Sequence, residues 1–154
     1  MLNALSKESN VKASLKKYFV DVLGNVVTFD TTLASPDIRV QGSTAIKQWY
    51  NINFREFGRQ TLAEYFFDVY ILSRQDPEGV KLAENTDTIM DLLVDNTMQD
   101  GMRRIPLYDI TKDPWELIGS MVVQDISDDE LYLPLEDETK AKVLAVRLRW
   151  GAAI

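Results

Sequence analysis

Carboxylates are the side chains best able to do chemistry in this 154-residue sequence, because it contains no histidine and no cysteine. That absence removes the commonest general base, the usual transition-metal ligand, the thiolate nucleophile and any disulfide. Glu64 and Asp68 lie in an alternating run that places both on one face of a strand. A close carboxylate pair in an apolar setting is a candidate general acid and base. Pairing with Lys47, Arg55 or Arg74 is the structural alternative, and the sequence favours it.

A second group of carboxylates has the composition of a cation site without its spacing. The group consists of Asp125, Asp128, Asp129 and Glu130. It lacks the alternating acidic positions, the central glycine and the final glutamate of an EF-hand loop. We therefore expect a solvated acidic loop from Asp125 to Glu138, and no metal. No glycine-rich loop precedes a Lys-Ser or Lys-Thr pair, so no cofactor site is predicted, and the sequence points away from an enzyme.

Composition places the chain among ordinary globular proteins. Apolar residues make up 45% and charged residues 27%, which predicts one domain over residues 1–154. The sequence has no basic amino-terminal region followed by an apolar run and no membrane-length apolar run, so a cytoplasmic protein is expected. The net charge of −7 argues against a reader of nucleic acid. Residues 78–154 carry eight basic and sixteen acidic side chains, against nine and eight in residues 1–77.

Two segments place apolar residues every three or four positions, which predicts two amphipathic helices. The first runs from about residue 3 or 10 to 23, with a cap at Ser9 or Asn10 and an end at Gly24. Its apolar face is formed by Val11, Leu15, Tyr18 and Val22. The second runs from about 79 to 95 and precedes a loop over 96–101. Its inward face is formed by Leu82, Thr86, Ile89 and Leu93. Its other positions carry the acids Glu84, Asp87, Asp91 and Asp95.

Elsewhere the period changes to two, which predicts strands. We expect short strands at 26–29 and 38–40, then an antiparallel hairpin from Ala45 to Ser73 whose second strand begins at Leu62. The segment 103–110 contains Pro106 and suits an edge strand or an irregular strand, and such an edge needs a partner or a cover. Two further strands, around 115–124 and 143–150, face each other across the acidic segment. The expected fold is α+β: a single domain, mainly an antiparallel sheet, with an N-terminal helix and a second helix packed on the sheet.

Arg103 and Arg104 form a small basic pair in the acidic half of the chain. They are candidates for contacts with acids on a neighbouring subunit. The candidate partners are Asp128, Asp129 and Glu130. A local ion pair at the surface, which contributes little to stability, is the alternative.

The order of these elements resembles that of the tail terminator (tail-completion) proteins of long-tailed bacteriophages. The likeness is greatest from Trp49 to Leu93, where the extended run WYNINF is followed by AEYFFDVYILSRQDPEG and then by the helix KLAENTDTIMDLLVD. The resemblance implies a structural, non-enzymatic subunit of a ring, with six copies expected. Such a ring caps the tail tube, ends its polymerisation and provides the surface for head attachment. The family has no catalytic motif to carry over.

The implied partners are copies of the chain itself, the tail-tube protein and a head-completion or connector protein. DNA is implied only as passing cargo, and no membrane is involved. The implied location is the virion tail, after assembly in the host-cell cytoplasm. Acids suit the lumen of such a ring because DNA is held by basic surfaces. The candidate lumen-facing residues are Glu84, Asp87, Asp91 and Asp95, or some of the acids from Asp125 to Glu138, including Glu136 and Asp137.

Two alternatives stay open. The first is a head-tail connector or a tail-tube component of the same fold. The second, from a different class, is a small-ligand-binding or enzymatic α+β domain, which needs a deep pocket lined by polar groups.

Overall fold

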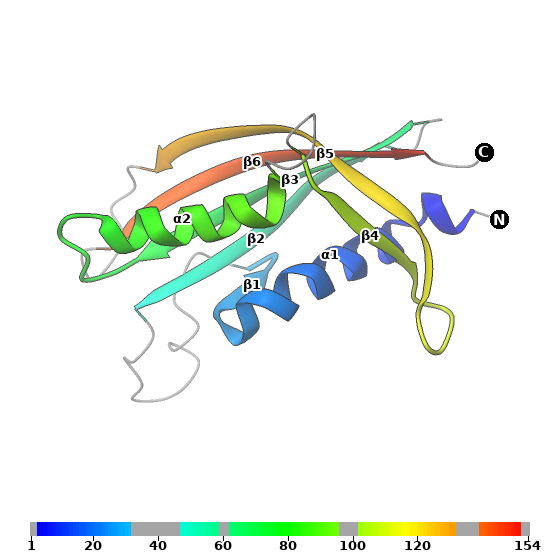
Figure 1. Cartoon of the computed structure of the whole chain (residues 1–154), viewed down its shortest axis with the longest axis horizontal. Coiled ribbons are helices and arrows are strands. Elements are labelled where there is room, and N and C mark those ends of the chain that lie inside the picture. Colours follow the sequence, from blue (N-terminus) through cyan, green and yellow to red (C-terminus); the bar gives the residue numbers. More distant parts are fainter. Residues whose placement is uncertain (1–2, 32–46, 59–61, 96–101, 132–138, 152–154) are drawn as a thin grey trace.

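A six-stranded sheet carries helices on one of its faces (Figure 1). The computed structural model describes residues 3–31, 47–58, 62–95, 102–131 and 139–151. The helices are α1 (Glu8–Leu23) and α2 (Val80–Leu93), with short 3-10 turns η1 (Ala4–Ser6) and η2 (Gly24–Val26). The strands are β1 (Val27–Phe29), β2 (Gln48–Gly58), β3 (Leu62–Ser73), β4 (Arg104–Asp109), β5 (Glu116–Leu131) and β6 (Lys140–Gly151).

The strands lie in the order β1, β2, β3, β6, β5, β4. The pair β1 and β2 is parallel, and every other neighbouring pair is antiparallel. Figure 1 shows α2 lying over the middle strands and α1 lying between β1 and β4, the two edge strands of a curled sheet. The predicted α+β class with two helices packed on a mainly antiparallel sheet is confirmed. The strand predicted at 38–40, the loop predicted at 96–101 and the acids at 136–138 lie outside the described residues.

The core forms between the helices and the inner face of the sheet. β3 runs over the predicted residues and pairs with β2 as the predicted antiparallel hairpin. Its inward residues are fully buried: Ala63, Tyr65, Phe67, Val69 and Ile71. Burying one such large apolar side chain stabilises the fold by about 1.5–3 kcal/mol. The alternation of β3 therefore fixes which face of the sheet the helices cover.

Helix α1 ends where predicted and starts at Glu8, between the two predicted starts, and Val11 and Leu15 are buried as predicted. Gly24 ends it with a φ of 67°, a conformation that glycine adopts readily. The predicted cap at Ser9 or Asn10 is wrong, because both residues lie inside the first turn. The predicted inward position of Val22 is also wrong: its side chain is 58% exposed, while Phe19 is buried. Steps of four residues from Val11 and Leu15 lead to Phe19, and a helix of this length keeps that stripe inward.

Helix α2 agrees with its prediction and is held at its start by Asp76. The carboxylate of Asp76 accepts hydrogen bonds from the N–H groups of Lys81 (3.3 Å) and Leu82 (2.9 Å) and from the Ser73 hydroxyl (3.2 Å). These bonds satisfy two of the backbone donors that every helix leaves unpaired at its start. Burial alone would raise the pKa of Asp76, but the hydrogen bonds outweigh it and lower the pKa.

The acidic loop predicted to start at Asp125 is wrong. β5 continues to Leu131 and pairs with β6 throughout that stretch. The charge of these residues does not break the strand: Asp125 lies opposite Arg147 in the pairing with β6, and the Asp128 carboxylate lies 3.4 Å from the Lys142 ammonium. The strand therefore occupies much of the segment that composition alone assigns to a solvated loop.

Candidate subunit-contact surfaces

The outer edge of β4 is covered by side chains of α1. The N–H of Tyr108 donates to the Ser14 hydroxyl (2.9 Å), and the N–H of Ile110 donates to the side-chain oxygen of Asn10 (3.1 Å). Pro106, two residues before Tyr108, has its nitrogen on the same edge of the strand and has no N–H to donate. Both α1 side chains are buried and lie one helical turn apart. The predicted edge strand is thus confirmed, and its cover comes from its own chain.

The other end of the sheet is also tied to α1. Lys12 of α1 forms an ion pair with Asp30, which follows β1, and lies 5.1 Å from the ring centre of Phe54 on β2. Burial opposes ionisation of Asp30, but the hydrogen bonds from Lys12 and from the Phe54 N–H, with the positive charge of Lys16 nearby, lower its pKa. Helix α1 thus contacts both edges of the sheet. Because it occupies the N–H groups of Tyr108 and Ile110, a strand from another molecule cannot pair with β4 there.

Large apolar side chains that stay exposed gather toward two opposite ends of the molecule. One group consists of Leu62 (54% exposed), Trp115 (42%) and Leu117 (63%). Leu62 starts β3, Trp115 directly precedes β5, and Leu117 is the second residue of β5, on the side where the N-terminus lies in Figure 1. The Trp115 ring leans on Tyr108, with 6.3 Å between ring centres. We call this group the hairpin end.

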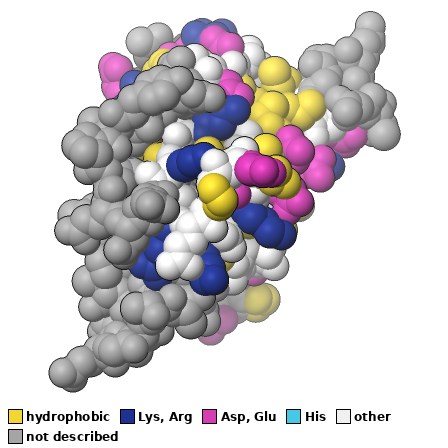
Figure 2. Space-filling view, turned by 90° about the vertical axis from the view of Figure 1, so that its left-hand side faces the viewer, with side chains coloured by type: hydrophobic (Ala, Val, Ile, Leu, Met, Phe, Trp, Pro, Cys, Tyr) yellow, Lys and Arg dark blue, Asp and Glu magenta, His cyan; other side chains and the backbone are white. Residues whose placement is uncertain are grey.

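The second group comes from the last turns of α1 and the first turn of α2, toward the other side of Figure 1, and we call it the lysine end. Its apolar members are Val20 (40% exposed), Val22 (58%) and Val80 (52%). Figure 2 looks onto this side and shows Lys and Arg side chains with hydrophobic ones between them, and Asp and Glu mainly along one side. The lysines of the elements that meet there are Lys47, Lys81, Lys140 and Lys142.

Charged side chains accompany the apolar ones at both ends. The turn between β4 and β5 holds Lys112 with the acids Asp109, Asp113 and Glu116. At the lysine end, Lys81 and Lys142 have carboxylate partners in Glu84 and Asp128. The two ends are therefore different surfaces, both partly apolar and both of mixed charge.

The helix-free face of the sheet carries ion pairs in place of the acid-base pair considered from the sequence. Asp68 lies 3.2 Å from the Arg55 guanidinium, and Glu64 accepts a hydrogen bond of 2.7 Å from Arg149. Burial raises the pKa of Asp68, and the charge of Arg55 opposes that shift. Each carboxylate thus has its own arginine, which removes the arrangement a general acid and base requires. The predicted pairing with Arg55 is confirmed, while Arg149 was not foreseen.

Of the predicted basic pair, Arg104 is the first residue of β4 and Arg103 directly precedes the strand. Arg103 donates to the main-chain oxygen of Asp91 (2.5 Å) and lies 3.5 Å from the Asp95 carboxylate. Arg104 is exposed. The local ion pair considered for Arg103 is therefore present, and contact of either arginine with a neighbour stays a prediction.

The predicted acids divide between two elements. On α2, Glu84, Asp87 and Asp91 are exposed, whereas Asp95 is half-buried beside Arg103. On β5, Asp128 pairs with Lys142, and the main chains of Asp129 and Glu130 lie opposite Val143 and Lys142. None of the helices in the described part of the chain is long and apolar enough to cross a membrane.

Two features of these surfaces were not predicted from the sequence. Asn10 and Ser14 looked like ordinary helix residues, since nothing local reveals that α1 lies along β4. Arg147 looked like the polar half of an alternating strand, although it proves to lie in a hollow of the helix-free face. The available signal in the sequence was the spacing of two polar residues, Asn10 and Ser14, by one helical turn.

No protein-family model matches the chain, and none of the curated proteins compared with it is significantly similar. Eight solved chains do match. One of them, whose name carries no function, is 11% identical in sequence, with a TM-score of 0.57 over 93% of this chain and 94% of that one. A likeness at that identity shows a shared fold.

Proposed function

We propose that this protein is the structural subunit of a ring that caps the tail tube of a long-tailed bacteriophage, ends its polymerisation and offers the surface for head attachment. The order of elements supports this proposal through its resemblance to tail terminator proteins. The observation that carries it is the separation of exposed apolar side chains into a hairpin end and a lysine end.

Two different contact surfaces at opposite ends favour head-to-tail association. A surface that meets a different surface of the next copy produces a closed ring when the rotation between copies closes, whereas a self-complementary patch stops at a dimer. Because α1 covers the β4 edge, side chains at the ends hold the subunits together, and strand pairing along Tyr108–Ile110 does not.

The other parts of the proposal follow from the ring. Its partners are further copies, six by the resemblance, together with the tail-tube protein and a head-completion or connector protein. The exposed acids Glu84, Asp87 and Asp91 of α2 face the lumen, where DNA passes without being held. Arg104 is the exposed member of the basic pair and contacts a neighbour. The protein acts in the virion tail after assembly in the host cytoplasm, and it is not an enzyme.

Sedimentation velocity at rising concentration, with negative-stain imaging in the presence of purified tail tubes, tests the proposal. We expect closed rings in solution or at tube ends. A protein that stays monomeric at every concentration and never decorates a tube end would refute it.

A further inference from the structure

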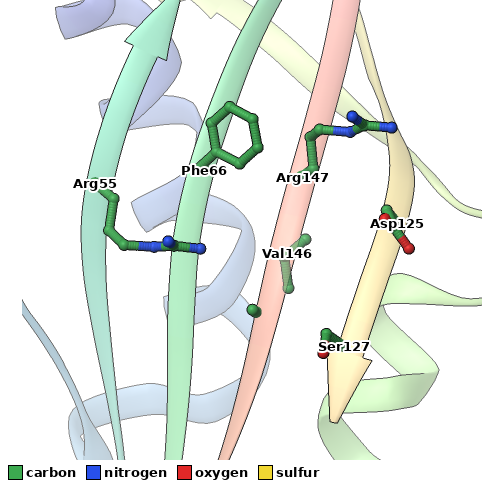
Figure 3. A pocket seen from close by; sticks show the side chains of 7 residues that line it. Arg55, Phe66, Asp125, Ser127, Val146 and Arg147 are labelled. Carbon is green, nitrogen blue, oxygen red and sulfur yellow. The ribbon is translucent and has the colours of Figure 1, made fainter.

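The helix-free face of the sheet contains a hollow of about 190 Å³, away from the two ends (Figure 3). Its walls come from β2, β3, β5 and β6. The lining residues are Arg55, Phe66, Asp125, Ser127, Ala145, Val146 and Arg147. The hollow is smaller than the roughly 300–1,000 Å³ of pockets that enclose small molecules. It has room for about one side chain.

Arg147 lines the hollow and has no ion pair within the described part of the chain. Arg55 is held by Asp68 and Arg149 by Glu64, both acids of β3. Arg147 lies one pleat from Arg149 on β6, and its Nε is buried without a hydrogen-bond partner. Among the described residues, none accepts a hydrogen bond from its guanidinium. The Nε itself is covered by the protein, so the terminal nitrogens of the guanidinium are the donors that a ligand can reach.

Asp125 lines the same hollow but does not neutralise Arg147. The two residues lie opposite each other in the pairing of β5 with β6. No ion pair joins them in the described structure, and the Asp125 side chain is exposed. Figure 3 shows the Phe66 ring between the side chains of Arg55 and Arg147, with Ser127 on the neighbouring strand. The hollow thus offers a guanidinium, a hydroxyl and an aromatic surface.

We propose that this hollow binds one carboxylate side chain, from an aspartate or glutamate of a partner protein. A planar guanidinium binds a carboxylate through two parallel hydrogen bonds, and Phe66 and Ala145 accept the methylene groups of the same side chain. A nucleic acid is disfavoured, because its row of phosphates needs an extended positive surface, and Arg55 and Arg149 are already held by Asp68 and Glu64. The site lies outside both ends, so it does not rest on the proposed ring.

Nuclear magnetic resonance of the arginine Nε–H groups tests the proposal on the full chain. The probe is N-acetyl-glutamate methylamide, with the matched glutamine compound and inorganic phosphate as controls. We expect the glutamate compound alone to move the Arg147 signal in a saturable way. Arg147→Gln should weaken binding at least about tenfold, judged from backbone amide signals of β5 and β6. Arg149→Gln, the matched change one pleat away, should weaken it less than threefold, as expected for an exposed charge.

Two results would overturn the proposal. The first is an Arg147 signal that the glutamate compound leaves in place, or that phosphate or the glutamine compound moves equally. The second is a comparable movement of that signal caused by Asp125→Asn in the free protein, which would show that Asp125 already occupies the guanidinium. The expected effect of Asp125→Asn is tighter binding of the probe with the free signal unchanged. Each of these readings uses the folded wild-type chain or an exposed-residue variant, so none depends on Arg147→Gln folding.

Discussion

The two faces of β3 differ in what covers them, although one alternating sequence forms both. Toward the helices, Tyr65, Phe67 and Val69 are fully buried against α1 and α2. On the other face, Glu64 and Asp68 are half-buried and hold arginines from β6 and β2. A substitution on the helix side removes buried apolar contacts, whereas a substitution on the helix-free face alters ion pairs and contacts with partner molecules. Stability and recognition are therefore assigned to opposite faces and can be tested separately.

The largest effect is expected from Leu93→Asp on the inward side of α2. Leu93 is fully buried, and a carboxylate placed there without a partner costs several kcal/mol. That cost approaches the whole stability of a domain, roughly 5–15 kcal/mol. Circular dichroism and solubility should show an unfolded, insoluble chain. Val80→Asp, the same kind of change at an exposed position of α2, should fold. A folded Leu93→Asp variant that fails only to associate would show that this side of α2 is an interface.

The next effect concerns the edge that α1 covers. Ser14→Ala leaves the N–H of Tyr108 without its acceptor, and Asn10→Ala does the same to Ile110. Each change should lower the free energy of unfolding by about 1–3 kcal/mol, because a buried donor is left unpaired. Urea denaturation measures the loss, with exposed Lys17→Ala on the same helix as the control, at about 0.5 kcal/mol or less. Losses equal to that of the control would mean that the edge needs no cover.

A smaller effect, dependent on pH, comes from Asp76. Its folded-state pKa lies below the ordinary value, so the stability it contributes is present above an unfolded pKa of about 4. That stability is lost as the pH falls through the lower folded pKa. Asp76→Ala should cost about 1 kcal/mol at pH 7, as the loss of a helix-start acceptor does. Urea melts from pH 7 to pH 3 should show a shallower loss of stability for the variant. Parallel curves would contradict the role given to Asp76.

The smallest effect is expected on the open face. The Glu64 and Arg149 side chains are 27% and 40% exposed, and such pairs contribute about 0.2–1 kcal/mol. A double-mutant cycle with Glu64→Gln and Arg149→Gln should give a coupling free energy in that range that falls as salt is added. A coupling of several kcal/mol would show that this face contributes to stability as strongly as the core.

The sequence predicted the features that depend on neighbours along the chain. The bounds of β3, the inward Ile89 and Leu93 of α2 and the stop at Gly24 follow from local periods and from the conformation of glycine. The misses depend on residues brought together by the sheet. β5 continues through its acids because its main chain pairs with that of β6 as far as Leu131.

Contacts between distant segments were equally out of reach. Ser14 reaches Tyr108 across 94 residues, and Arg149 reaches Glu64 across 85. No local pattern encodes such a pairing before the order of the strands is known. The exposed positions at the two ends, such as Val22, were missed for a related reason: a small phase error in a helix turns an inward residue outward.

Mixing two variants tests head-to-tail association most directly. Val22→Asp blocks the lysine end, and Trp115→Asp blocks the hairpin end; both positions are exposed, so both variants should fold. Each variant alone should be unable to close a ring and should sediment as smaller species than the wild type. Mixed in equal amounts, they retain one intact pair of surfaces between them, and light scattering should show a dimer of twice the 17.6 kDa chain mass. A mixture that stays monomeric beside a wild type that assembles, or variants that assemble as the wild type does, would contradict association through these two ends.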